Sequence, residues 1–273
     1  MSEQANIAII TGGASGIGLA TAEALFPRNN WIVYLLDRDA ERGETAADKT
    51  GAYFIRVDVT DYASLAAAFG RVFKEHGKIN FVFANAGIAL EAPPETPKEL
   101  SNEPPAAPSM KMLSVNLQSV MFTTHLAQHY FRQSPAASGP RCIVVTASSA
   151  SLYASAIAPA YAASKHGVLG WTRSIAPDAW KQDQVRVNAI LPGIVRTNIL
   201  PPEMFAMFPE QMLTPVDKVV EVVLLLLDGD GDEKAGRELR SGQAVEICGT
   251  NHYVRNQQEY CDPVMAAIMG VGA

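Results

Sequence analysis

Short β-branched runs alternate with longer helical stretches along most of this 273-residue chain. The alternation is typical of βαβ units and a parallel sheet. Most of the short runs are continuously apolar, as strands are when helices cover both faces of their sheet. The pattern predicts an α/β fold, a doubly wound parallel sheet of about seven strands. Strands are expected at Ile7–Thr11, Ile32–Asp37, Tyr53–Asp58, Ile79–Ala84, Cys142–Ser148, Arg186–Leu191 and Ala244–Cys248, and helices at Ile17–Phe26, Ala40–Lys49, Tyr62–His76, Met110–Phe131, Tyr161–Trp180 and Pro215–Leu227.

The composition suits one domain that binds a small molecule. Hydrophobic residues make up 48% of the chain and charged residues 18%, which is enough apolar material for a sizeable core. The formal net charge of −6 at pH 7 argues against a nucleic-acid or anionic-membrane partner, because no positive field attracts phosphates. We therefore expect a small-molecule partner and no nucleic acid.

The cysteines indicate a reducing compartment, and the hydropathy indicates a chain without a membrane span. Cys142, Cys248 and Cys261 are odd in number and lack CxxC spacing, so neither a disulfide framework nor a zinc site is expected. From the polar start MSEQAN, no secretion signal is expected. The most apolar run, Val219–Leu227, is far shorter than the roughly 20 residues that cross a bilayer. A cytoplasmic protein without a membrane span or a metal is expected.

Two segments interrupt the alternation of strands and helices. Glu91–Ser109 contains six prolines, too many for a regular helix or a central strand, and predicts a surface excursion. Leu200–Pro215 has flanking prolines around methionine and phenylalanine side chains. The second segment predicts either a mobile apolar cover over a substrate or an ordinary surface helix.

A glycine-rich turn, TGGASGIG, follows the first expected strand and precedes a helix rich in alanine and leucine. A pyrophosphate needs close approach of the backbone, free N–H groups and the positive end of a helix, and such a turn supplies all three. The spacing of Gly12, Gly16 and Gly18 is wider than GxGxxG, and a glycine cluster alone can be only a tight turn. Its place on the first strand-to-helix crossing favours a dinucleotide site.

Asp37 ends the second expected strand, about 20 residues after the glycines, where a carboxylate accepts hydrogen bonds from ribose hydroxyls. The same carboxylate would repel a 2′-phosphate, so it favours NAD over NADP. The neighbouring Arg38 leaves an alternative open, since its guanidinium can bind that phosphate or stack beside adenine.

Four motifs in order resemble those of the short-chain dehydrogenase/reductase family. They are TGGASGIG, the triplet Asn85-Ala86-Gly87, the YxxSK motif from Tyr161 to Lys165, and Pro192-Gly193 followed by Ile194, Val195 and Thr197. The resemblance extends from about Ile7 to Cys248. It implies one NAD(P)-binding Rossmann domain over residues 1–273, with substrate-covering segments at about 88–110 and 198–215 and a tail at 249–273. It also implies cofactor contacts from Gly12, Ser15, Gly16, Ile17, Gly18, Asp37, Arg38, Asp58, Val59, Asn85, Ala86, Gly87, Tyr161, Lys165, Pro192, Gly193, Val195 and Thr197.

The resemblance also implies a catalytic set of Asn116, Ser148, Tyr161 and Lys165. Tyr161 and Lys165 are four residues apart, so on a helix they project from one face. A free tyrosine has a pKa near 10 and is a poor base at neutral pH unless nearby positive charge favours the phenolate. Lys165 and an oxidised nicotinamide supply such charge, and Tyr161 then exchanges the alcohol proton.

Three further assignments come from the family pattern. Thirteen residues before Tyr161, Ser148 would hydrogen-bond the substrate oxygen, and the register of IVVTASSAS selects it over Ser149 and Ser151. Asn116 matches the family asparagine that holds a water chain to the lysine. Asp58 matches a residue near adenine, although capping of the next helix is the alternative.

The stretches YAASKHGVLGWTRS, VRVNAILPGIVRTNIL and GQAVEICGTNHYV resemble the 15-hydroxyprostaglandin dehydrogenase-like branch. The branch implies NAD-dependent oxidation of secondary alcohols on lipophilic substrates, here a terpenoid, polyketide or fatty-acid-like molecule. Alternatives are an NADPH-dependent carbonyl reductase in biosynthesis and a non-enzymatic dinucleotide-binding protein. The family further implies a homodimer or homotetramer formed through Met110–Phe131 and Tyr161–Trp180. The tail either closes the substrate site or packs on a partner.

Overall fold

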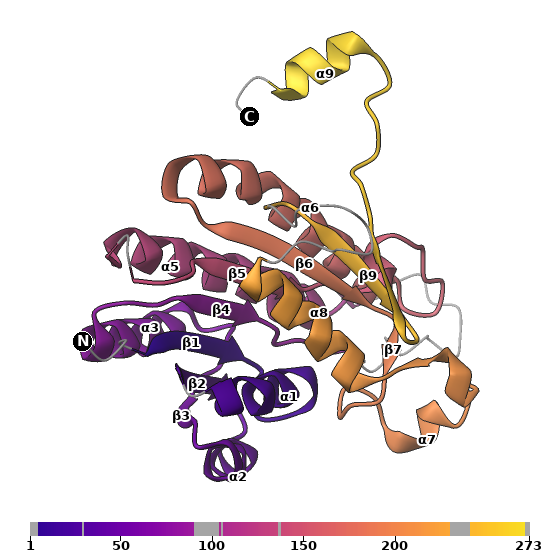
Figure 1. Cartoon of the computed structure of the whole chain (residues 1–273). Helices are drawn as coiled ribbons and strands as arrows, with labels where there is room; N and C mark the ends of the chain where they lie inside the picture. Colours follow the sequence, from indigo (N-terminus) through magenta and orange to yellow (C-terminus); the bar gives the residue numbers. More distant parts are fainter. Residues whose placement is uncertain are drawn as a thin grey trace.

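The computed structural model describes residues 5–28, 30–89, 104, 106–135, 138–229 and 241–270, which form one main sheet of eight strands (Figure 1). Their order is β10-β9-β6-β5-β4-β1-β2-β3. All neighbours run parallel except β10, which is antiparallel to β9. The strands are β1 Asn6–Thr11, β2 Trp31–Asp37, β3 Tyr53–Arg56, β4 Phe81–Ala84, β5 Cys142–Thr146, β6 Arg186–Pro192, β9 Ala244–Cys248 and β10 Asn251–Val254, and β7 Ile194–Val195 pairs separately with β8 Leu213–Thr214. The expected α/β fold and all seven expected strands are confirmed.

The expected helices are also present, one of them interrupted. Within Met110–Phe131 a π-helical turn, Ser114–Gln118, separates the short α4 from α5. Asn116 lies in that turn, so the interruption falls at a predicted site residue. The helices are α1 Gly16–Leu25, α2 Ala40–Thr50, α3 Tyr62–His76, α4 Lys111–Leu113, α5 Ser119–Gln133, α6 Pro159–Asp183, α7 Pro202–Phe205, α8 Val216–Asp228 and α9 Pro263–Gly270.

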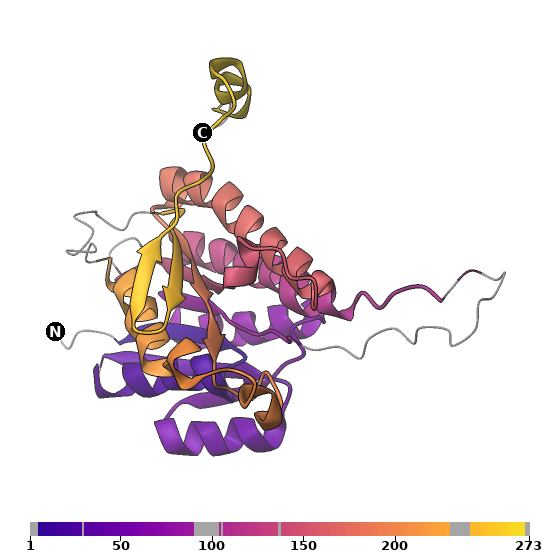
Figure 2. The same ribbon diagram turned by 90° about the vertical axis from the view of Figure 1, so that its right-hand side faces the viewer.

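Helices cover both faces of the sheet, which explains why the strands are apolar on both sides. On one face, side chains of α1, α2 and α8 pack with alternate strand residues, among them Ile10 and Val144. On the other face, α3, α5 and α6 pack with the intervening residues, among them Ile9 and Val145. Figure 2 shows α8 and α6 on opposite sides of the sheet.

The strand order reverses at β1, whose neighbours are β4 and β2. In doubly wound sheets the crevice at such a reversal, beyond the carboxyl ends of the strands, is where ligands bind. The glycine-rich turn after β1 lies at this edge. The segments after β2, β4, β5 and β6, all of them parallel to β1 within the sheet, reach the same edge.

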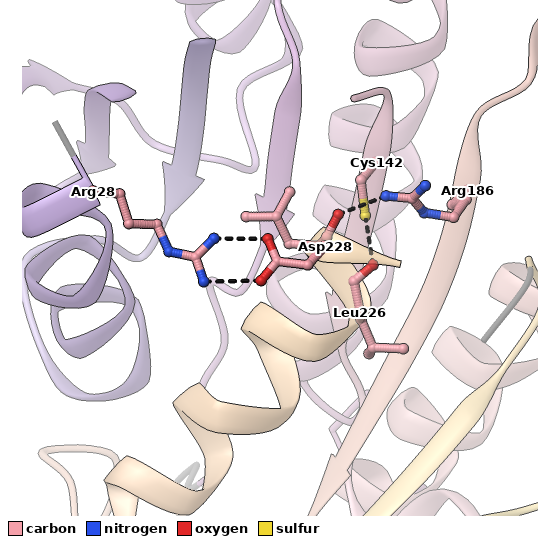
Figure 3. A network of polar contacts seen from close by, with 6 residues as sticks. Arg28, Cys142, Arg186, Leu226 and Asp228 are labelled. Atoms are coloured by element: carbon pink, nitrogen blue, oxygen red, sulfur yellow. Dashed lines mark hydrogen bonds and ion pairs between the residues drawn. The ribbon is translucent and has the colours of Figure 1, made fainter. Parts of the chain in front are cut away.

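At the opposite edge of the sheet, a polar network holds the end of α8 (Figure 3). Arg28 pairs with Asp228 through two hydrogen bonds of 2.7 and 2.9 Å. Arg186, the first residue of β6, donates to the Leu227 carbonyl at 2.5 Å. Burial raises the pKa of the Cys142 thiol to about 12, so the thiol stays protonated and donates to the Leu226 carbonyl at 3.5 Å. Carbonyls at the helix end are thereby satisfied from β5 and β6.

The segment Leu200–Pro215 is not one surface helix. It consists of α7, a 3₁₀ turn at Glu210–Met212 and β8, because prolines start the first two pieces and β8 pairs with β7. Phe205 and Leu213 are buried, whereas Met207 and Met212 are exposed. The surface-helix alternative is therefore wrong, and the role as a substrate cover stays a prediction. Of the proline-rich Glu91–Ser109, residues 91–103 and 105 lie outside the described residues.

The tail adds two elements that the sequence did not predict. Strand β10 extends the sheet beyond β9, and α9 has no buried residue. Figures 1 and 2 both show α9 away from the body of the protein, with the segment after β10 connecting them. Across the described residues, no helix combines the length and the hydropathy needed to span a bilayer.

Candidate active site

In the glycine-rich turn between β1 and α1, main-chain atoms approach one another closely. A Cβ on Gly18 would overlap the Gly12 carbonyl oxygen, and a Cβ on Gly12, whose φ is +64°, would lie 2.9 Å from the Ala86 Cα. Ser15 is the N-cap of α1, and its side chain makes no capping hydrogen bond. The first N–H groups of α1 are therefore available to an anionic ligand beside the turn.

Asp37 is fixed over this turn by backbone donors. Its Oδ2 accepts from the Ala14 N–H at 3.2 Å and its Oδ1 from the Asp39 N–H at 3.1 Å. The carboxylate thus faces the start of α1 from the end of β2. Each oxygen retains a lone pair, so the group can accept further hydrogen bonds from a ligand.

Asp58 follows β3 and accepts hydrogen bonds from the Thr60 N–H at 2.9 Å and the Thr60 hydroxyl at 2.7 Å. These bonds, with a smaller contribution from Arg38, lower the pKa of Asp58. The N-cap of α3 is Asp61, which accepts from the Ala63 and Ser64 N–H groups. The helix-capping alternative for Asp58 is therefore wrong.

Asn85 joins three strands at the centre of the site. Its Nδ2 donates to the carbonyls of Thr11 and Gly12 at 3.2 Å, and its Oδ1 accepts from the Thr146 hydroxyl at 3.0 Å. These contacts tie the ends of β1, β4 and β5 together. The side chain therefore shapes the glycine-rich turn from within the protein.

Tyr161 and Lys165 lie on one face of α6, as predicted. The Lys165 Nζ is 5.8 Å from the centre of the Tyr161 ring and donates to the Thr146 carbonyl at 2.8 Å. Burial lowers the pKa of Lys165 to about 8. Burial raises the pKa of the Tyr161 phenol, and a hydrogen bond with Ser148 opposes that rise. The arrangement places a phenol between a hydroxyl and a buried amine.

Ser148 lies two residues after β5 and begins a 3₁₀ turn, Ser149–Ser151. Its Oγ accepts from the Ala150 N–H at 3.2 Å, which leaves the hydroxyl proton free to be donated toward Tyr161 or a substrate oxygen. The residue is 7% exposed. Its orientation is thus set by its own turn.

Asn116 is fully buried and uses its side chain within the protein. Its Oδ1 accepts from the Ile88 N–H at 2.8 Å, and its Nδ2 donates to the Ile88 carbonyl at 2.9 Å and to the Ser164 hydroxyl at 3.1 Å. A Cβ on Gly87 would lie 3.2 Å from this Oδ1 and 3.6 Å from the Lys165 Nζ. Asn116 and Lys165 therefore flank the same small space, while the role in a water chain stays a prediction.

A cavity of 380 Å³ connects the glycine-rich turn with the tyrosine and the lysine. Of the predicted site residues, Gly18 and Asn116 do not line it, and every other one does. The cavity brings together Gly12, Ser15, Gly16, Ile17, Asp37, Arg38, Asp58, Val59, Asn85, Ala86, Gly87, Ser148, Tyr161, Lys165, Pro192, Gly193, Val195 and Thr197. The sequence did not single out Ala14, Leu36, Asp39, Arg42, Val57, Ile88, Ala89, Val115, Thr146, Ala147, Asn198 and Ile199, which also line it. Most of these residues are next to a predicted residue in the sequence, so their closeness to a motif could have identified them.

The chain is similar to known dehydrogenases and reductases. The family described as short chain dehydrogenase matches residues 6–204. The short-chain dehydrogenase/reductase prx7 of Penicillium rubens is 40% identical over 270 residues, which cover 93% of this chain and 95% of that protein. The human 15-hydroxyprostaglandin dehydrogenase (NAD+) is 35% identical over 208 residues, 73% of this chain and 72% of that protein.

Solved structures share the fold. Levodione reductase superposes with a TM-score of 0.68 at 25% identity, covering 90% of this chain and 97% of that one. The 3-ketoacyl-(acyl-carrier-protein) reductase from Brucella melitensis, complexed with NADH, has a TM-score of 0.72 at 24% identity and covers 91% and 98%. These likenesses support the α/β fold described above.

Proposed function

Because the chain belongs to the short-chain dehydrogenase/reductase family, we propose that it uses NAD to interconvert a secondary alcohol and a ketone on a lipophilic small molecule. Family membership makes the protein an NAD(P)-dependent oxidoreductase. The finer proposal depends on one cavity that holds both parts of the site. Asp37 lines it at the end of β2, and Ser148, Tyr161 and Lys165 line it after β5 and on α6.

The described residues fit a dinucleotide. Gly12 and Gly18 allow backbone approach that any Cβ would block, and the start of α1 offers N–H groups to a pyrophosphate. Asp37 would accept the ribose hydroxyls. When bound, the nicotinamide supplies the site that accepts or donates hydride.

The chain's own residues handle the proton. Ser148 would donate to the substrate oxygen, and the Tyr161 phenol would take the alcohol proton in oxidation or return it in reduction. Burial raises the pKa of Tyr161, so its ionisation needs opposing contributions. The Ser148 hydroxyl supplies one. The positive charge of Lys165, held by the Thr146 carbonyl 5.8 Å from the Tyr161 ring centre, would supply another.

NAD is the proposed cofactor because Asp37 is held toward the cavity by Ala14 and Asp39, where a 2′-phosphate would meet a carboxylate. Titration calorimetry with NAD and NADP separates the choices. We expect NAD to bind more tightly, and Asp37→Ala to weaken NAD binding and narrow the difference. Unchanged affinities in Asp37→Ala would contradict this assignment, and Lys181→Ala on the exposed end of α6 serves as the matched control.

A specific observation favours the alternative of an NADPH-dependent carbonyl reductase. Arg38 and Arg42 both line the cavity next to Asp37, and guanidinium groups bind phosphate well. If NADP binds more tightly than NAD, and Arg38→Ala abolishes that preference, the reductase is the better assignment.

A lipophilic substrate is supported by the apolar side chains of Ile88, Val115 and Ile199, which line the same cavity as the catalytic set. A relative acts on hydroxyprostaglandin, to judge from its name. Terpenoid, polyketide and fatty-acid-like secondary alcohols form the test panel, with NADH absorbance as the readout. Turnover of small polar alcohols alone would reject the proposal. Exposed Met207 and Met212 support a covering role for residues 198–215, and replacing both methionines with serine should raise KM for large alcohols more than for small ones.

We also propose a homodimer or homotetramer formed through α5 and α6. Met121 on α5 is 36% exposed and Trp180 on α6 is 38% exposed. Sedimentation equilibrium of the whole chain tests the assembly, and Met121→Glu should shift it toward the monomer.

The three unpaired cysteines support a cytoplasmic site of action.

A further inference from the structure

We propose that Ser151 is a positioning residue that holds two members of the catalytic set, Ser148 and Lys165, in their relative places. The inference rests on the proposed function, since it concerns the same reaction. No motif of the sequence assigns Ser151 a role. The family pattern aligns with Ser148, three residues earlier, and leaves Ser151 without a role.

The Ser151 hydroxyl makes one bond to each of the two residues. Its Oγ accepts from the Ser148 N–H at 3.2 Å and donates to the Lys165 carbonyl at 2.8 Å. The Ser151 N–H in turn donates to the Ser148 carbonyl at 2.8 Å. One side chain therefore connects the turn after β5 with the middle of α6.

Burial makes these bonds consequential. Ser151 is 3% exposed, Ser148 is 7% exposed and Lys165 is 3% exposed. A backbone N–H that loses its partner at such a place cannot turn to bulk water, so the chain around it shifts or the donor stays unsatisfied. Removing the Ser151 hydroxyl should therefore move the Ser148 turn relative to α6.

The displacement would reach the phenol of Tyr161. The Ser148 hydroxyl, in the turn after β5, hydrogen-bonds the phenol. The Lys165 ammonium lies one turn along α6, 5.8 Å from the ring centre. The hydrogen bond with Ser148 favours the phenolate. If Ser148 moves away, the Tyr161 phenol should titrate at higher pH.

The first measurement needs no substrate and no cofactor. An ultraviolet difference titration of the whole chain against its Tyr161→Phe variant isolates the ionisation of this one tyrosine. In Ser151→Ala we expect the midpoint of the Tyr161 titration to rise by about half a pH unit to one unit, which corresponds to one lost hydrogen bond. Ser149→Ala is the matched control, because the Ser149 side chain is only partly buried and does not line the cavity; its titration should equal that of the parent.

The second measurement uses turnover with NAD and an alcohol from the panel. Ser151→Ala should lower kcat by about ten- to a hundredfold and move the acidic limb of the pH profile upward, with KM for NAD unchanged. In a Ser148→Ala background the same substitution should cost much less, because its effect passes through Ser148. If Ser151→Ala is too unstable, Ser151→Cys, which keeps a weaker donor, replaces it with the same expected directions.

The outcomes separate this proposal from the proposed function. A folded Ser151 variant whose Tyr161 titration matches that of Ser149→Ala overturns the positioning role. The positioning role is also overturned if kcat falls only in proportion to the folded fraction and the acidic limb of the pH profile does not move. If no alcohol of the panel reacts but the titration shifts, the substrate class is wrong and the positioning role of Ser151 stands.

Discussion

The Lys165 ammonium lies 2.8 Å from the main-chain carbonyl oxygen of Thr146, at the end of β5. Lys165 is 3% exposed, and burial lowers its pKa to about 8. Among the described ion pairs, no carboxylate partner of Lys165 occurs. The protein thus holds a buried amine beside the phenol with a neutral acceptor, so its charge is available to the phenol and costs folding energy.

Replacing this amine should cost activity and add stability. The folded pKa of Lys165, about 8, is below its ordinary value of 10.5, so the unfolded chain binds more protons between these values. Stability should therefore rise as the pH increases from about 8 to 10.5, and the full cost of the charge is present below pH 8. Lys165→Met removes that cost, and we expect Tm at pH 7 to rise by about 2–4 °C despite the lost hydrogen bond to Thr146.

Differential scanning calorimetry at several pH values checks this, together with turnover, which should be nearly abolished. Lys181→Met is the matched control, since Lys181 is exposed on the same helix. A lower Tm of Lys165→Met at pH 7 would mean that the bond to Thr146 outweighs the cost of burial.

Tyr161→Phe should reduce kcat by about 10²- to 10⁴-fold, the usual contribution of a positioned proton donor. The Kd for NAD, measured by calorimetry, should stay unchanged because the ring remains in place. Tyr153→Phe is the control: Tyr153 is 53% exposed, and its hydroxyl contacts Glu246 at 3.3 Å rather than the catalytic set. Equal activity of the two variants would remove Tyr161 from the proton chemistry.

The sequence predicts the buried part of the fold because burial leaves a pattern. All of β4 and most of β1 and β2 are buried, and each is a continuous apolar run. Strand β10 was missed because its residues alternate between exposed and half-buried at the edge of the sheet, and four such residues resemble a loop. The π-helical turn at Ser114–Gln118 was missed because Ile88 and Ser164, which hold Asn116, lie far away in the sequence.

The sequence likewise predicts some residues of the candidate site and not others. Residues whose spacing is local, such as Tyr161 and Lys165 one helical turn apart, were predicted, and the structure brings them together. Ser151 was not, because no motif names it and its hydrogen bond to the Lys165 carbonyl forms only in the folded protein. Asp61 was overlooked as the cap of α3 because Asp58, three residues earlier, offers the same carboxylate.

Arg186→Leu should destabilise the protein without changing the Kd for NAD. Arg186 satisfies the Leu227 carbonyl at the end of α8, at the edge of the sheet opposite the cavity (Figure 3). Loss of a charged donor to a buried carbonyl costs about 1–3 kcal/mol. Urea unfolding measures it, and Arg28→Gln, which breaks the half-exposed pair with Asp228, should cost less than about 1 kcal/mol. Equal losses in both variants would show that the network acts as one unit.

Gly18→Ala should abolish dinucleotide binding while the chain still folds. A Cβ at Gly18 would overlap the Gly12 carbonyl oxygen and approach the Asn85 Nδ2 to 2.8 Å, so the turn between β1 and α1 must open. The N–H groups at the start of α1 would then no longer face a pyrophosphate. Calorimetry should detect no NAD binding, whereas Gly170→Ala, where a Cβ meets nothing within 4 Å, should bind NAD like the parent and gain about 0.5–1 kcal/mol of helix stability. NAD binding of parental strength by a folded Gly18→Ala protein would place the pyrophosphate elsewhere in the cavity.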